Sequence, residues 1–95
     1  MEIGKVYKEV LVNELGITRM SDGYKITLEL QSSEGDQAIQ LLGVREVDNL
    51  AELLEAERLW VQEDEGSQVE FGRYQLCVSG ETYTEIVCDE VTTNS

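Results

Sequence analysis

The sequence contains no histidine and no proline, and it has only two cysteines. Without histidine, the chain cannot assemble a Ser-His-Asp triad, a Cys-His pair or any other histidine-based acid–base site. Two cysteines alone cannot supply the four ligands of a structural zinc site, and no P-loop or G-x-G-x-x-G run is present. We therefore predict that the protein is not an enzyme and that it has no catalytic residues, no metal site and no cofactor.

Long apolar runs are missing as well. No segment approaches the roughly 18 apolar residues that a membrane-spanning helix needs, and the start, "MEIGKVYKEV", lacks the apolar region of a signal peptide. These absences predict a cytoplasmic protein that does not contact membranes. Ninety-five residues with 41% hydrophobic content fit one modest core. We assign residues 1–91 to a single domain and residues 92–95, the end of the polar stretch "VTTNS", to a flexible C-terminal tail.

Positive charge is scarce, because twenty Asp and Glu residues stand against seven Lys and Arg residues, for a formal net charge of −13. Residues 1–45 hold seven acids and five bases, whereas residues 46–95 hold thirteen acids and two bases, Arg58 and Arg73. Such a second half repels nucleic acids and anionic membranes and attracts basic proteins or cations. We therefore predict no direct nucleic-acid binding and a basic protein as the partner.

Strand patterns fill the first third of the sequence. Residues 5–12, "KVYKEVLV", are rich in valine and tyrosine, and residues 24–30, "YKITLEL", alternate between apolar and polar side chains. The apolar face of the second segment consists of Tyr24, Ile26, Leu28 and Leu30. Asp22 and Gly23 favour a type I′ hairpin turn, which needs a positive φ at both positions. In that register Ile17 lies opposite Leu28, and residues 16–20 form the partner strand.

A first helix is predicted after residue 33. Ser33 and Asp36 have the spacing of a capping box, and Gly43 is typical of a helix C-terminus. The apolar stripe between them consists of Ala38, Leu41 and Leu42.

A second helix is predicted to begin at Asp48 or Asn49, because Asn49 and Glu52 resemble another capping box. Its apolar face consists of Leu50, Leu53 and Leu54. Glu52 and Glu55 are expected to point outward. By Arg58 the pattern becomes typical of a strand again.

A meander of three strands is predicted for the last third, at residues 58–62, 68–78 and 82–91. The turns fall at residues 65–67 and 79–80. In the middle strand the apolar residues occupy odd positions up to Phe71 and even positions from Tyr74, and a bulge near Gly72 and Arg73 would place both sets on one face. The fold class is therefore α+β, with an antiparallel sheet in the order β-β-β-α-α-β-β-β and two short helices packed on one face.

The two cysteines do not face one another in this meander. A turn at residues 79–80 places Cys77 opposite Thr82 and Cys88 opposite Phe71, and pairing the two thiols directly requires poor turn chemistry. Two free, buried thiols are favoured, and a disulfide across other strands is the alternative.

The stretch "QEDEGSQ", residues 62–68, was tested as a cation site. With Gly66 at the sixth position of an EF-hand loop, Val61 and Gly72 fall where the loop needs acids, which excludes an EF-hand. A looser Mg²⁺ or Ca²⁺ site at Glu63, Asp64 and Glu65 is an alternative. Adjacent acids at a hairpin tip diverge, however, so a solvated turn is favoured.

The remaining candidate is an acidic surface built by the second helix, the hairpin that follows it and the last strand. The predicted partner-binding residues are Glu46, Asp48, Glu52, Glu55, Glu57, Glu63, Asp64, Glu65 and Glu70. The last strand adds Glu81, Glu85, Asp89 and Glu90. Acids three apart on a helix or two apart on a strand lie about 5–7 Å from one another, a charge density similar to that of nucleic-acid phosphates.

These acids suggest a nucleic-acid mimic that occupies the basic nucleic-acid-binding surface of a partner protein. In composition and size, though in no motif, the chain resembles small phage-encoded inhibitors of restriction or of RNA-guided (CRISPR) defence, which act in the host cytoplasm. The mimicry requires the acids at 46–57 and those at 63–70 to share one face. Acidity that serves only solubility or salt adaptation is a further alternative. Salt-adapted proteins tend to favour Asp, however, and here Glu outnumbers Asp fifteen to five.

A second hypothesis is a small homo-oligomer, such as a homodimer. Trp60, Phe71 or Tyr83 at an edge of the meander would pair across a two-fold axis, although Trp60 also fits an ordinary core position. A pocket between protomers would then bind a small ligand or serve as an interaction site.

Overall fold

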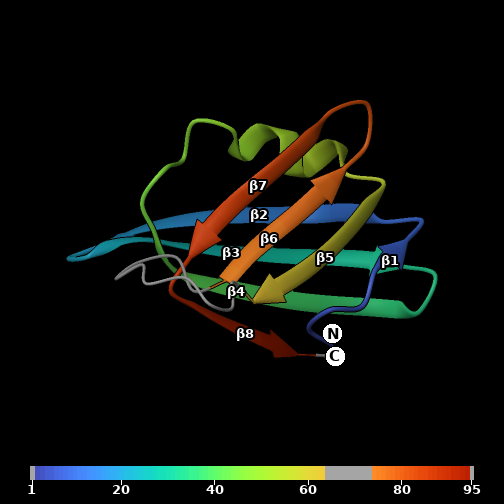
Figure 1. Cartoon of the computed structure of the whole chain (residues 1–95), viewed down its shortest axis with the longest axis horizontal. Coiled ribbons are helices and arrows are strands. Elements are labelled where there is room, and N and C mark those ends of the chain that lie inside the picture. Colours follow the sequence, from blue (N-terminus) through green and yellow to red (C-terminus); the bar gives the residue numbers. More distant parts are fainter. Residues whose placement is uncertain (1, 64–73, 95) are drawn as a thin grey trace.

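Two four-stranded sheets form the described part of the chain, and every neighbouring pair of strands is antiparallel. The structure is a computed structural model that describes residues 2–63 and 74–94. The elements are β1 (Tyr7–Lys8), β2 (Leu11–Met20), β3 (Gly23–Ser32), β4 (Gly35–Val44), the 3-10 helix η1 (Leu50–Glu55), β5 (Arg58–Glu63), β6 (Tyr74–Ser79), β7 (Tyr83–Cys88) and β8 (Glu90–Asn94). Sheet A has the order β1-β5-β6-β7 and sheet B the order β2-β3-β4-β8 (Figure 1). The predicted α+β fold with two helices on one sheet is therefore wrong.

The strand expected at residues 5–12 is split between the two sheets. β1 pairs with β5 in sheet A, and β2 begins sheet B at Leu11. Between them Glu9 adopts a φ of +53°, and the Val10 amide donates to the Glu57 carbonyl at 3.0 Å. The left-handed conformation of Glu9 thus turns the chain from one sheet to the other.

The hairpin between β2 and β3 is confirmed, but its predicted register is wrong. Met20 pairs with Gly23, and Ile17 pairs with Ile26 rather than with Leu28. Gly23 has a φ of +137° and Asp22 has no positive φ, so the type I′ turn is absent. Because the register differs by two residues, the same side chains still share one face of the sheet, although Ile17 is 52% exposed at the edge strand.

The first predicted helix is instead β4, the partner of β3. Its buried residues, Gln37, Ile39 and Leu41, alternate with half-buried ones, which is the period of a strand. Gly35 follows the hairpin turn with a φ of +107°. Gly43, with a φ of +76°, lies where the register with β3 shifts, so it is a bulge glycine and not a helix stop.

The second predicted helix exists only as η1, a 3-10 helix of six residues. Leu50 and Leu53 are buried as expected, but Leu54 is 48% exposed. Asn49 makes no side-chain capping hydrogen bond, so the predicted capping box is wrong. Glu52 instead accepts a hydrogen bond from the Thr84 hydroxyl of β7.

The strand predicted at 58–62 is confirmed as β5, and the last hairpin is confirmed with a different loop. Ser79 pairs with Tyr83, which leaves residues 80–82 as the loop. Cys77 therefore lies opposite Glu85 rather than Thr82, and Cys88 opposite Tyr74. The predicted turn at residues 65–67, the bulge near residue 72 and Phe71 lie outside the described residues. Both cysteines are free and buried, as predicted, and burial raises the pKa of the Cys88 thiol to about 12.

β8 occupies the part of the chain where a flexible tail was expected. Residues 90–94 pair with β4, and Thr93 lies opposite Ile39. The Asp89 amide donates to the Leu42 carbonyl at 2.8 Å, which fixes the passage of the chain from sheet A to sheet B. The strand predicted over residues 82–91 is thus two strands, β7 in sheet A and β8 in sheet B.

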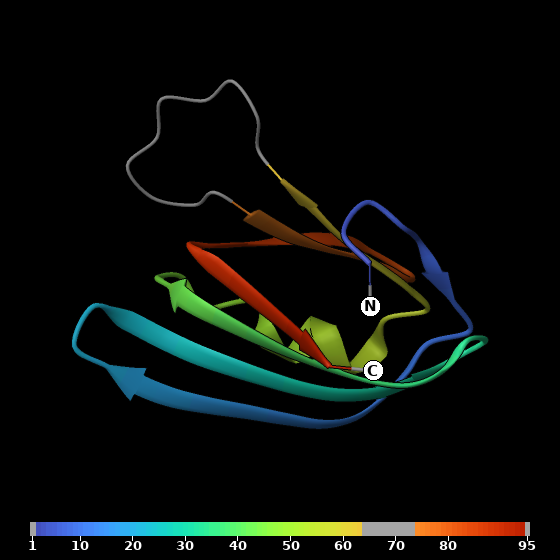
Figure 2. The same cartoon turned by 90° about the horizontal axis from the view of Figure 1, so that it is seen from below.

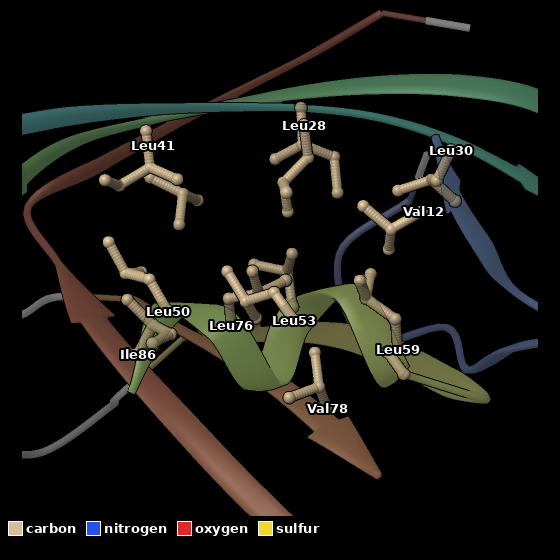
Figure 3. Packing of buried hydrophobic residues seen from close by; sticks show 14 of the residues in the cluster. Val12, Leu28, Leu30, Leu41, Leu50, Leu53, Leu59, Leu76, Val78 and Ile86 are labelled. Carbon is tan, nitrogen blue, oxygen red and sulfur yellow. The ribbon is translucent and has the colours of Figure 1, made fainter. Parts of the chain in front are cut away.

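The core lies between the two sheets, which form separate layers in Figure 2. Leu28 and Leu41 of sheet B point toward Leu76 of sheet A, and η1 inserts Leu50 and Leu53 between the layers (Figure 3). The alternation of apolar residues along each strand supplies the two inner faces. η1 lies at the side of the sandwich formed by β2 and the hairpin between β6 and β7 (Figure 1). This position brings the segment before η1 beside β7.

Candidate partner-binding surface

A cleft of about 390 Å³ lies between β7 and the segment that joins β4 to η1. The residues that line it are Arg45, Glu46, Asp48, Asn49, Glu85, Ile86 and Val87. Figure 1 shows the joining segment passing on the side of β7 that is away from β6. Successive side chains of a strand point to opposite faces. Because three consecutive residues of β7 line the cleft, the cleft lies beside the edge of the strand and not over one of its faces.

β7 is the edge strand of sheet A. Within the described residues it pairs on one side only, with β6, and its ladder is regular from Tyr83 to Cys88. Thr84, Ile86 and Cys88 point into the core, and the alternate side chains are exposed. An edge of this kind presents backbone N–H and C=O groups that no neighbouring strand binds.

Carboxylates dominate the charge of the cleft. Arg45 forms two hydrogen bonds with Asp89, from Nη1 to Oδ1 at 3.2 Å and from Nη2 to Oδ2 at 3.0 Å, and this pairing raises the pKa of Arg45. Its positive charge is thereby balanced by Asp89. No ion pair joins Glu46, Asp48 or Glu85 to another described residue. The cleft therefore presents three carboxylates without a cationic partner from the described part of the chain.

An aromatic pair covers the outer face of sheet A beside the cleft. The rings of Trp60 and Tyr83 have centroids 6.0 Å apart and planes tilted by 32°. The Tyr83 hydroxyl donates to Glu85 Oε1 at 2.6 Å, and this bond raises the pKa of Tyr83 strongly. Cys77 lies buried on the same face, where burial raises the pKa of its thiol. Trp60 thus packs outside the core that joins the two sheets, and Tyr83 remains 54% exposed.

A second acidic region surrounds the end of η1. The Glu57 amide donates to the Ser79 carbonyl at 2.9 Å, so the end of η1 lies against the hairpin between β6 and β7. A Cβ at Gly80 would lie 2.8 Å from the Glu55 carbonyl oxygen, which explains why this hairpin needs glycine there. Glu55, Glu57 and Glu81 are exposed at this junction.

The predicted site residues do not form one continuous surface. Glu46 and Asp48 line the cleft, and Glu55 and Glu57 lie at the end of η1. Glu52 does not point freely outward as predicted, because its half-buried carboxylate accepts a hydrogen bond from the Thr84 hydroxyl.

Glu63 lies apart from these residues. It ends β5, roughly 17 Å along the strand from Arg58 at 3.3 Å per residue. The other predicted members, Asp64, Glu65 and Glu70, are outside the described residues. The alternative cation site at residues 63–65 lies largely there too.

Sequence reasoning missed the role of β7. The segment "YTEIVC" has the alternation of a strand, but only the sheet order shows that it is an edge and that Glu85 faces the same cleft as Glu46. The 38 residues between these two glutamates leave no local signal of their proximity.

Over the described ranges, no group of three or more Cys, Asp and Glu side chains is placed to hold a metal ion. No helix in these ranges combines the length and the apolar content that crossing a membrane requires. Comparisons with protein-family models, with curated proteins and with solved structures gave no match for the chain.

Proposed function

We propose that this protein is a non-enzymatic binding protein that acts in the cytoplasm by occupying the basic nucleic-acid-binding surface of a partner protein. The observation that carries the proposal is the set of carboxylates around β7 and η1. These are Glu46, Asp48 and Glu85 in the cleft and Glu55, Glu57 and Glu81 beside the hairpin. In this role the protein is a nucleic-acid mimic of the anti-restriction or anti-CRISPR type.

The arrangement suits a basic partner for electrostatic reasons. Carboxylates that form no ion pair with a described residue remain able to attract Lys and Arg side chains of another protein. Such attraction accelerates association and weakens as salt screens it, with a Debye length of about 8 Å at physiological ionic strength. The binding surface is smaller than the sequence suggests, because Glu52 is used internally and Glu63 lies at the far end of β5.

The decisive experiment is a pull-down from a nuclease-treated host lysate at low and moderate salt, with and without excess DNA as competitor. The cleft variant replaces Glu46→Gln, Asp48→Asn and Glu85→Gln together. A matched control variant replaces Glu2→Gln, Glu34→Gln and Asp36→Asn, which changes the net charge equally. These controls lie in the N-terminal segment and at the turn between β3 and β4, away from the segment beside β7 in Figure 1.

We expect the wild-type protein to retain a nucleic-acid-binding protein that DNA displaces. The cleft variant should lose at least about tenfold in affinity for it, whereas the control variant should change by less than threefold. Equal retention by both variants, or a captured protein that ignores DNA, would contradict the proposal.

A homodimer through β7 is the second candidate, and the exposed Tyr83 and Val87 on this edge favour it. A homodimer through β7 would, however, bring the carboxylates of a second copy to this edge, where β7 contains no basic residue to offset them. Light scattering distinguishes the two: a monomer at micromolar concentration removes the homodimer.

A further inference from the structure

The free edge of β7 has no bulge, proline or lysine to prevent another strand from pairing with it. Protected edges carry bulges, prolines or lysines, or are very short. β2, an edge of sheet B, has a bulge between Val12 and Glu14, and β1 has only two residues. β7 has six residues in regular register and contains neither proline nor lysine. Residues 45–49 pass beside this edge and line the cleft with it, so a further strand would enter between them and β7.

The cleft lies where such a strand would add to sheet A. A strand added to a sheet lies about 4.8 Å from its neighbour, and the opposite wall here is residues 45–49, which belong to no strand or helix. The volume of about 390 Å³ falls within the range of sites that hold a ligand of a few residues. The opening therefore borders Glu85, Ile86 and Val87, and its volume is comparable to that of a short peptide segment.

The charges select the occupant. Glu85 offers a carboxylate on β7, while Glu46 and Asp48 offer two on the opposite wall. Tyr83 and Val87 offer exposed apolar surface on either side of Glu85. An extended segment that alternates basic with β-branched residues matches both features, whereas a second copy of β7 brings another carboxylate and no basic residue to this edge.

We propose that a basic, extended segment of the partner protein adds to sheet A along β7 and lies in this cleft. The addition supplies main-chain hydrogen bonds for affinity, and the carboxylates supply specificity for Lys and Arg. The inference rests on the proposed function, since it names the part of the basic partner that this surface binds.

The probe for this inference is a capped seven-residue peptide of alternating Lys and Val. The control peptide has the same sequence but is N-methylated at every residue, so it keeps the charge and loses the backbone donors. Binding is followed by NMR titration and by amide hydrogen exchange of residues 83–88. We expect the unmodified peptide to protect amides of β7 and to bind at least tenfold more tightly than the control peptide.

Two protein variants locate the site. Val87→Lys puts a lysine beside the cleft, and Thr92→Lys makes the same change on β8 of the other sheet. We expect the first to weaken the unmodified peptide at least tenfold and the second less than threefold.

Equal binding of the two peptides without protection of β7 would overturn strand addition, and so would no binding at millimolar peptide. In either case the pull-down still decides the proposed function, because it depends on the carboxylates and not on backbone pairing. Loss of binding in the Thr92→Lys variant alone would also overturn the placement in the cleft.

Discussion

Carboxylates lie close together on sheet B and in the cleft beside sheet A, but the two groups have different neighbours. On sheet B, Glu14 and Glu29 lie directly opposite one another on β2 and β3, and their carboxyl groups are hydrogen-bonded to each other, which raises the pKa of Glu29. In the cleft, Glu46, Asp48 and Glu85 come from segments far apart in sequence and face an open volume beside an unpaired edge. The comparison teaches that a surplus of acids does not define a binding surface. Their arrangement decides whether they bind one another or remain available to a partner.

The two groups also depend on different parts of the fold. The Glu14–Glu29 pair needs only the hairpin of β2 and β3, whereas the cleft needs η1 to hold residues 45–49 beside β7. Leu53→Ala removes a fully buried side chain of η1, and we expect it to lower the free energy of unfolding by about 2–5 kcal/mol. Urea denaturation measures this loss. Leu54→Ala, at the exposed neighbouring position, is the control and should cost less than about 1 kcal/mol.

Amide hydrogen exchange in the Leu53→Ala variant distinguishes the cleft from the hairpin of β2 and β3. Hydrogen exchange should increase around η1 and β7 more than in the hairpin of β2 and β3. An equal increase in both regions would show that the cleft is no more dependent on η1 than the hairpin is.

The hydrogen bond from Thr84 to Glu52 ties η1 directly to β7, so its removal tests the cleft more locally. Thr84→Val removes the donor and leaves a half-buried carboxylate without it, and we expect a loss of about 1–2 kcal/mol in the free energy of unfolding. Thr82→Val, in the exposed loop of the same hairpin, should change it by less than about 0.5 kcal/mol. If Glu52→Gln in the Thr84→Val background costs as much as in the wild type, the two side chains are not coupled.

The pH dependence of stability should reveal the carboxyl pair on sheet B. Because the folded-state pKa of Glu29 is raised, its contribution to stability is fully present below the unfolded-state pKa and is lost as pH rises through the folded-state pKa. Glu14→Gln removes the like charge opposite Glu29. We expect this variant to gain stability over the wild type as pH rises from about 4 to 7, in thermal unfolding followed at each pH. A difference that stays constant across this range would contradict the shared proton.

Local patterns in the sequence predict several elements but not how they assemble. The alternation in residues 24–30 and the β-rich residues 58–62 are confirmed as strands, because one buried face imposes a period of two. Residues 35–44 were misassigned because Ala38, Leu41 and Leu42 also fit a helical stripe, and glutamine, alanine and leucine are good helix formers. Ile39 does not fit that stripe and is buried, and sheet pairing overrides the local preference.

The candidate site is less accessible to sequence reasoning than the fold. The acidity of residues 46–57 was visible, and Glu46 and Asp48 do line the cleft. Two features could not be predicted from the sequence: the hydrogen bond between Thr84 and Glu52, and the position of Glu85 and Glu46 in the same cleft. Both depend on long-range contacts between η1, its preceding segment and β7, and no spacing along the chain encodes them.

The pairing of β1 with β5 and of β4 with β8 has a consequence for the order of folding. β1 can pair only after Leu59, the partner of Tyr7, has been synthesised, and β4 can pair with β8 only after Val91, the partner of Leu41. The strands β2, β3 and β4, in contrast, can pair as soon as each is synthesised. Contacts of such long sequence separation slow folding. During synthesis the nascent chain thus carries a three-stranded meander whose apolar face stays open until sheet A arrives, and this interval is when it is most exposed to aggregation.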